Sequence, residues 1–156
     1  MIIDSIFLMD QLNTVLDEHE VGRSIKLDEP PTINILHVED DETIAAVARE
    51  LLEARGWDVE SCSDGMSAIE KISSEVHYDF LLIDPDLPDL NGLELVCRAR
   101  TLAHRSRIAI GVLSANSVEA EAREAGADVF LRKPQHILSL PETITRLLSE
   151  LKESDS

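Results

Sequence analysis

The chain reads Phe80-Leu81-Leu82-Ile83-Asp84-Pro85-Asp86-Leu87-Pro88-Asp89-Leu90-Asn91-Gly92 near its middle. Four consecutive apolar residues stop abruptly at Asp84, and a loop rich in aspartate and proline follows them. A continuous apolar run of this length is typical of a strand that is buried on both faces, as strands of parallel sheets are. Asp84 would therefore lie at the carboxyl end of a buried strand, where open parallel sheets place their ligand sites.

Short apolar runs alternate with amphipathic segments on both sides of this stretch. The apolar runs predict strands over 33–38, 58–62, 79–83, 108–113 and 128–131. The amphipathic segments predict helices over 43–55, 65–73, 92–100, 118–125 and 137–151. Five such repeats indicate an α/β fold, a doubly wound parallel five-stranded sheet with helices on both faces.

The first 32 residues depart from this pattern. Apolar residues at spacings of three and four predict one face of an extra N-terminal helix that runs to about residue 18, namely Ile2, Ile6, Met9, Leu12 and Leu16. A polar segment that ends in Pro30-Pro31 is expected to be a linker. The expected organisation is therefore an amphipathic helix and linker over 1–32, a main domain over 33–151 and a tail over 152–156.

The composition narrows the classes of function. The chain has 156 residues with 31 Asp+Glu against 14 Lys+Arg, which gives a formal net charge of −17, and phosphate repulsion would oppose direct binding to nucleic acid. No apolar run reaches the roughly 18 residues of a membrane span, and the N-terminus lacks the basic leader of a signal peptide. Cys62 and Cys97 fit neither a disulfide framework nor a paired metal site. These features predict a cytoplasmic protein that binds no nucleic acid directly and no membrane.

Carboxylates also follow the first predicted strand, at Glu39 and Asp40. Strands one and three of such a sheet are commonly neighbours, so these two residues are expected to converge with Asp84. Because three unpaired carboxylates repel one another, a hard divalent cation such as Mg²⁺ would suit the cluster. Strands four and five end near Ser114 and Lys133, which would complete a pocket that accepts a phosphoryl group.

From residue 33 to about residue 150, the chain resembles the receiver domain of bacterial two-component response regulators, a flavodoxin-like (βα)5 fold of the CheY-like superfamily. The resemblance rests on the order and spacing of five motifs, which are His37-Val38-Glu39-Asp40-Asp41-Glu42, Asp64-Gly65, Leu82-Ile83-Asp84-Pro85-Asp86-Leu87-Pro88-Asp89-Leu90-Asn91-Gly92, Leu113-Ser114-Ala115 and Ala125-Gly126-Ala127-Asp128-Val129-Phe130-Leu131-Arg132-Lys133-Pro134.

The resemblance implies that a histidine kinase or a histidine phosphotransfer protein phosphorylates Asp84. Glu39 and Asp40 would bind Mg²⁺ directly or through water. Asp84 would add a ligand through its side chain, and Asp86 would add one through its backbone carbonyl. The chain would then be a signalling phosphoprotein rather than an enzyme, with self-phosphorylation and autodephosphorylation as its chemistry.

The resemblance also implies roles for residues after the fourth and fifth strands. Ser114 and Lys133 would contact the phosphoryl group, and the bond before Pro134 would be cis. Phe130 would either change rotamer with Ser114 or simply fill the core. Output would pass through the surface formed by residues 118–151 to an unknown protein target or to a second copy of the chain. The N-terminal helix could instead pack on its own domain, bind a partner or form a homodimer. Few residues follow this surface, so we expect no effector domain within this sequence.

Two other hypotheses remain open at the level of the sequence. Asp84 and Asp86 could be the paired aspartates of a Mg²⁺-dependent haloacid-dehalogenase-like phosphatase, although Leu87 stands where that family is expected to have threonine or valine. Alternatively, the chain could be an interaction domain that works without phosphorylation.

Overall fold

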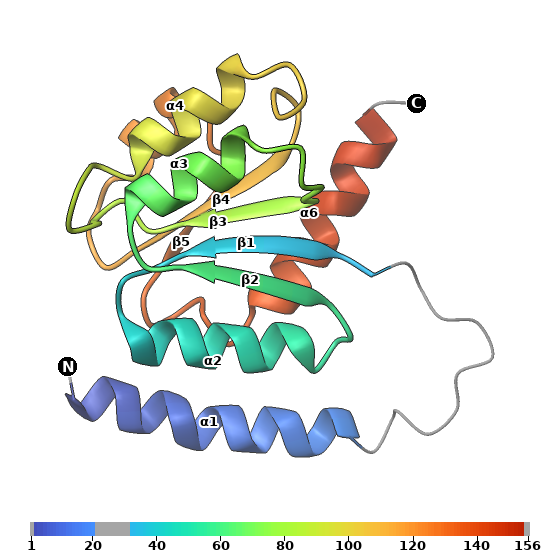
Figure 1. Ribbon diagram of the computed structural model, residues 1–156. Coiled ribbons are helices and arrows are strands. Elements are labelled where there is room, and N and C mark those ends of the chain that lie inside the picture. Colours follow the sequence, from blue (N-terminus) through green and yellow to red (C-terminus); the bar gives the residue numbers. More distant parts are fainter. Residues whose placement is uncertain (1, 21–31, 155–156) are drawn as a thin grey trace.

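The sheet is formed by five parallel strands in the order β2-β1-β3-β4-β5. The computed structural model describes residues 2–20 and 32–154 (Figure 1). The strands are β1 (Asn34–Val38), β2 (Asp58–Cys62), β3 (Phe80–Ile83), β4 (Ala109–Ser114) and β5 (Val129–Arg132). The helices are α1 (Ile2–Glu20), α2 (Glu42–Glu53), α3 (Gly65–Ser73), α4 (Leu93–Thr101), α5 (Glu119–Ala125) and α6 (Leu140–Ser154).

The strand order identifies the fold as flavodoxin-like, as the sequence predicted. Each predicted strand is present within one residue of its expected bounds, and the strand over 58–62 and the helix over 65–73 agree to the residue. The last helix differs more, because turns occupy residues 133–139 and the helix then continues to residue 154. The expected tail over 152–156 is therefore helical as far as residue 154. Residues 21–31 of the expected linker lie outside the described part of the chain.

Helices cover both faces of the sheet, with α2 and α6 on one face and α3, α4 and α5 on the other (Figure 1). Alternate residues of β1 divide between two buried cores, because successive side chains of a strand point to opposite faces. Ile35 packs in the core beneath α2 and α6, and Leu36 and Val38 pack in the core beneath α3, α4 and α5. Helix α1 lies outside α2 and runs in the same direction, so both helices begin at the edge where the strands end.

Helix α1 buries a different face from the one that its spacing predicted. Leu8 and Leu12 are each 1% exposed and belong to the core beneath α2 and α6. Ile6 and Met9, which were expected on the buried face, are 59% and 40% exposed, so that part of the prediction is wrong. The side chain of Ile2 lies outside the described residues. Because the first half of the helix is apolar on several sides, periodicity alone could not select the face that packs.

A pair of substitutions tests this packing. Leu12→Ala should lower the free energy of unfolding by about 3 kcal/mol, because it removes a fully buried side chain and leaves a cavity. Ile6→Ala, which lies on the exposed face of the same helix, should change it by less than about 0.5 kcal/mol. Urea unfolding of the two variants measures both values. Equal losses would mean that α1 does not pack through Leu12.

Within residues 2–20 and 32–154, none of the helices combines the length and the apolarity that crossing a bilayer would demand.

Candidate functional site

The pairing of β1 with β3 brings two acidic segments to one edge of the sheet. Val38 pairs with Ile83 at the ends of these strands, and the next residue of each strand continues the ladder. The Asp84 amide donates to the Val38 carbonyl at 2.9 Å, and the Glu39 amide donates to the carbonyl of Cys62 at 2.9 Å. The carboxyl ends of the strands therefore fix the backbone positions of Glu39 and Asp84.

Three carboxylates converge at this edge. One carboxylate oxygen each from Glu39, Asp40 and Asp84 lies within 4.8 Å of the other two. Glu39 and Asp84 are 3% and 4% exposed, whereas Asp40 is open to solvent. Carboxylate oxygens are the ligands that hard divalent cations prefer, so the chemistry of this donor set fits Mg²⁺.

Lys133 supplies a positive charge to the same cluster. Its Nζ lies 2.7 Å from Glu39 Oε1 and 3.2 Å from Asp84 Oδ2. Burial alone would lower the pKa of the Lys133 amine, but the charges of Glu39 and Asp84 outweigh burial and hold that pKa above its usual value. The ammonium therefore stays charged between the two carboxylates. The peptide bond between Lys133 and Pro134 is cis, as the resemblance implied.

Glu39 is the carboxyl group whose ionisation the site disfavours. Burial and the adjacent Asp84 carboxylate raise the pKa of Glu39 well above its usual range, against the opposing effect of Lys133. Burial is the larger cause and the neighbouring Asp84 carboxylate is the smaller one, and a bound divalent cation would offset both by favouring the ionised carboxylate. The cluster is therefore arranged for a cation rather than for three free charges.

The loop after β3 folds back onto Asp84. The Asp86 amide donates to Asp84 Oδ1 at 2.8 Å, and it is the first backbone donor after Asp84 because Pro85 has no N–H. The Gly92 amide donates to the Pro85 carbonyl at 2.8 Å. A Cβ atom at Gly92 would lie 2.1 Å from the Asp84 carbonyl oxygen, so a residue without a side chain is required where the loop closes.

Ser114 and Asn116 follow β4 at the same edge of the sheet. Ser114 is fully buried, and its Oγ accepts a hydrogen bond of 3.0 Å from the Asn116 amide. Asn116 Nδ2 donates to Asp86 Oδ2 at 2.8 Å. The loops after β3 and β4 are thus joined next to Asp84. Phe130 is 8% exposed and packs in the core beneath α3, α4 and α5.

His37 lies two residues before Glu39 and is 1% exposed. Neither of its ring nitrogens has a hydrogen-bond partner among the described residues. Burial, together with the charge of Lys133, lowers the pKa of His37 to about 4. The imidazole is therefore held neutral beneath the acidic cluster.

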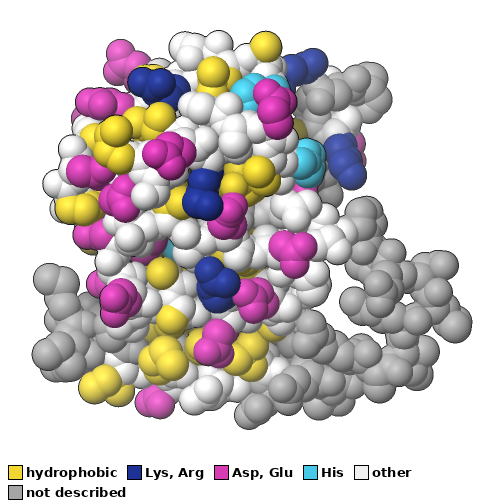
Figure 2. Space-filling view, in the orientation of Figure 1, with side chains coloured by type: hydrophobic (Ala, Val, Ile, Leu, Met, Phe, Trp, Pro, Cys, Tyr) yellow, Lys and Arg dark blue, Asp and Glu magenta, His cyan; other side chains and the backbone are white. Residues whose placement is uncertain are grey.

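The structure brings the predicted residues together from four strand ends. Asp89 is a further residue near this site, and sequence reasoning assigned no role to it. Its carboxylate accepts hydrogen bonds from the amides of Gly65 and Met66 in the first turn of α3. A loop carboxylate carries no sequence signal for which distant helix end it contacts. Most of the other acidic residues whose burial the structure describes lie on the surface, and Figure 2 shows Asp and Glu side chains scattered over one face among Lys and Arg.

The family model of the response regulator receiver domain matches residues 35–145. The chain is 29% identical over 122 residues to the polar-differentiation response regulator DivK of Brucella ovis. This alignment covers 76% of this chain and 98% of that protein. It is 32% identical over 123 residues to the transcriptional regulatory protein TrcR of Mycobacterium tuberculosis. That alignment covers 78% of this chain and 46% of TrcR.

Solved structures of receiver domains also superpose on this chain. A CheY-like response regulator receiver domain protein from Methanospirillum hungatei JF-1 superposes with a TM-score of 0.72 at 28% identity, over 80% of this chain and 99% of that one. The receiver domain of a sensor histidine kinase from Pseudomonas aeruginosa PAO1, with a magnesium ion coordinated in its active site cleft, has a TM-score of 0.69 at 27% identity, over 76% of this chain and 99% of that one.

Proposed function

Since the chain belongs to the response regulator receiver domain family, we propose that it is a phospho-accepting receiver of a two-component phosphorelay. Asp84 would take the phosphoryl group from a histidine kinase or a histidine phosphotransfer protein. One observation carries the proposal. Asp84 is a buried carboxylate at a strand end, with two further carboxylates within 4.8 Å and the Lys133 ammonium 3.2 Å away.

Glu39, Asp40 and Asp84 are proposed to hold Mg²⁺ with their side chains, directly or through water, and Asp86 with its backbone carbonyl. Two observations support this assignment, namely the convergence of the three carboxylates and the magnesium ion in the cleft of the Pseudomonas aeruginosa relative. When bound, the ion would neutralise negative charge on the phosphoryl oxygens during transfer.

The chain's own residues would carry out the remaining steps. A carboxylate oxygen of Asp84 attacks phosphorus, so that an O–P bond forms as the N–P bond of the donor phosphohistidine breaks and its imidazole leaves. The Lys133 ammonium, already charged and positioned at Asp84, pairs with the transferred group. The Ser114 hydroxyl is proposed to donate to a phosphoryl oxygen. Its Oγ accepts from the Asn116 amide, and a hydroxyl can accept and donate at the same time.

Phosphorylation would add about −1.5 to −2 charges near pH 7, by analogy with phosphorylated hydroxyl side chains. The arrangement of Ser114 and Lys133 that best pairs with this charge would become the favoured one. Phe130 is proposed to follow Ser114 by changing rotamer, which would alter the surface formed by α5, β5 and α6. That surface would bind a downstream protein target or a second copy, in the cytoplasm and without direct contact to nucleic acid. We propose that the receiver domain spans residues 33–151 and that an N-terminal helix and a linker precede it over residues 1–32. The N-terminal helix is an alternative contact for a homodimer.

The test is incubation with acetyl phosphate, with Mg²⁺ in one sample and with EDTA in the other, followed by intact-mass measurement. The proposal expects a gain of one phosphoryl group in the Mg²⁺ sample and none with EDTA. Turnover of small phosphate esters would instead favour a haloacid-dehalogenase-like phosphatase. No Mg²⁺-dependent response to acetyl phosphate or to beryllofluoride would favour an interaction domain that works without phosphorylation.

A further inference from the structure

The segment over residues 85–92, here called the acceptor loop, is closed on itself. Its two ends are joined by the hydrogen bond from the Gly92 amide to the Pro85 carbonyl and by an antiparallel bridge between Asp86 and Asn91. A loop that is closed at its base moves as a unit. The position of Asp86 therefore depends on what holds the tip of the loop as well as on its own contacts with Asp84 and Asn116.

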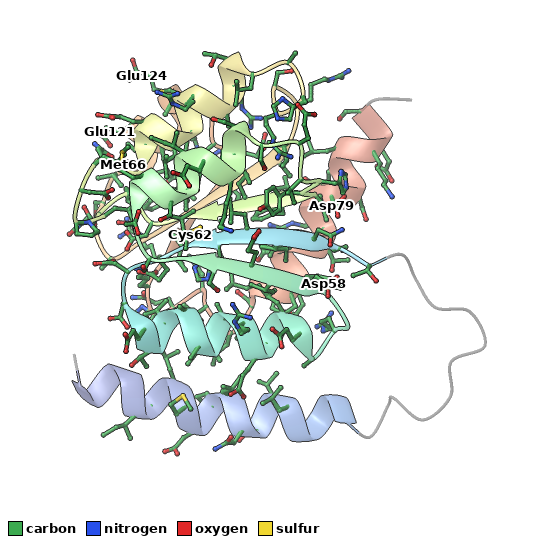
Figure 3. All side chains as sticks on the ribbon, viewed as in Figure 1. Asp58, Cys62, Met66, Asp79, Glu121 and Glu124 are labelled. Carbon is green, nitrogen blue, oxygen red and sulfur yellow. The ribbon has the colours of Figure 1, made fainter. Side chains whose placement is uncertain are left out.

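The tip is held by Asp89. Its Oδ1 accepts from the Gly65 amide at 2.8 Å, and its Oδ2 accepts from the Met66 amide at 2.9 Å. These amides belong to the first turn of α3, where backbone N–H groups have no partner within the helix. Two oxygens on two adjacent donors fix the orientation of the carboxylate as well as its position. Figure 3 labels Met66 at this end of α3, on the side of the sheet where the strands end.

Electrostatics favour the same contact. Hydrogen bonds from the Gly65 and Met66 amides lower the pKa of Asp89, so its carboxylate is ionised at neutral pH. A negative charge at the start of a helix also interacts well with the helix dipole.

Packing supports the contact independently of hydrogen bonding. A Cβ atom at Gly65 would lie 2.3 Å from Leu90 Cγ. The acceptor loop therefore rests directly on the backbone of the first turn of α3, and Asp89 and Leu90 fasten the loop at neighbouring points.

Helix α3 already has a cap of its own. Asp64, its N-cap residue, accepts from the Ser67 amide at 2.7 Å and from the Ser67 hydroxyl at 3.1 Å. That contact spans three residues and leaves the acceptor loop untouched. The contact made by Asp89 instead joins segments that lie 24 residues apart in the sequence. Asp64 and Asp89 thus cap one helix end, but they differ in what they connect.

We propose that Asp89 is a positioning residue, which ties the acceptor loop to the first turn of α3 and so places the Asp86 carbonyl and amide against the acidic cluster. This inference rests on the proposed function, because the site that it serves is the proposed Mg²⁺ and phosphoryl pocket. The observed connection runs from the α3 amides through Asp89 and the closed loop to Asp86, whose amide donates to Asp84 Oδ1 at 2.8 Å. Without Asp89 the pocket keeps its side chains, and the loop keeps the contact of Asp86 with Asn116 and the packing of Leu90, but the hydrogen bonds that tie the loop to α3 are lost.

The experiment compares Asp89→Ala with Asp64→Ala in the full chain. Calorimetric titration with Mg²⁺ alone measures affinity, and thermal unfolding measures stability. Both variants should lose stability, since each lacks one cap of the same helix. Asp89→Ala should also weaken Mg²⁺ binding by about tenfold, in line with the loss of outer partners at metal sites, and Asp64→Ala should bind Mg²⁺ as the wild type does. Asp89→Asn keeps one acceptor oxygen and should fall between Asp89→Ala and the wild type.

The possible failures can be distinguished. A wild-type chain that does not bind Mg²⁺ would overturn the proposed metal site, and the inference with it. A wild-type chain that binds Mg²⁺, with Asp89→Ala and Asp64→Ala equally close to it in affinity, would overturn only the positioning role, because Asp89 would then act as a simple helix cap. Asp89→Asn preserves the size of the side chain, so the comparison stands even if Asp89→Ala does not fold.

Discussion

Asp84→Asn is expected to abolish the Mg²⁺-dependent phosphoryl gain completely. The carboxamide has nearly the size of the carboxylate, so the buried position next to Lys133 remains filled. An amide lacks the ionised oxygen that attacks phosphorus, and it cannot form the acyl phosphate. Intact-mass measurement with acetyl phosphate, with Mg²⁺ and with EDTA, reads the result directly.

A matched control removes a different carboxylate from the same edge of the sheet. Asp41 follows the acidic pair and caps α2 by accepting from the amides of Thr43 and Ile44. Asparagine is as good a cap as aspartate, so Asp41→Asn should retain both the fold and the phosphoryl gain. A phosphoryl gain that persists in Asp84→Asn would show that another side chain is the acceptor, and the assignment of Asp84 would have to be abandoned.

The second large expected effect is a loss of folding stability at acid pH, to which His37 contributes. The pKa of this imidazole is about 4 in the folded chain against about 6.5 for an unperturbed histidine. At His37 the unfolded chain therefore binds more protons than the folded chain between these values, and the contribution of this residue to stability falls as pH decreases through this window. Glu39 acts in the opposite direction, because its raised pKa makes the folded chain hold the extra proton, so the share of His37 is read from the difference between the variant and the wild type. His37 should account for a loss of about 2 kcal/mol between pH 7.5 and pH 5.

Replacing His37 by leucine should remove this share of the pH dependence. At pH 7.5 the variant should be at least as stable as the wild type, because leucine buries no polar nitrogen where neither ring nitrogen of His37 has a partner among the described residues. The difference in stability between the variant and the wild type should be about 2 kcal/mol larger at pH 5 than at pH 7.5, in favour of the variant. Urea unfolding at several pH values gives both numbers.

His104 provides the control for His37. It is exposed, and its ring nitrogen contacts the Ser74 carbonyl at 2.8 Å. His104→Gln removes an exposed imidazole and leaves the buried imidazole of His37 in place. If His37→Leu and the wild type lose stability in parallel as pH falls, His37 is not the titrating group and the explanation fails.

The fold and the centre of the site could be predicted because they depend on short-range pattern and on a general property of parallel sheets. Continuous apolar strands locate the sheet, and their carboxyl ends meet at one edge, so the sequence alone predicts that Glu39, Asp40 and Asp84 converge. Lys133 joined them from β5 for the same reason, and its Nζ lies within 3.2 Å of both buried carboxylates.

The remaining features depend on contacts between distant segments. The buried face of α1 was predicted incorrectly at Ile6 and Met9, because a helix that is apolar on several sides offers more than one face and the shape of the domain selects among them. The contact of Asp89 with α3 has the same character. Any loop carboxylate can cap a helix, and only the folded chain determines which helix end it reaches.

The direction of α1 has a practical consequence for anyone who immobilises or labels this protein. Helix α1 begins at the edge where the strands end, which is also the edge that carries the acidic cluster, whereas α6 ends at the opposite edge (Figure 1). A resin or a fluorophore attached ahead of residue 2 would be tethered at the edge of the sheet from which the proposed phosphodonor approaches. Attachment beyond residue 154 would hold the molecule from its far side, with Asp84 facing the solution.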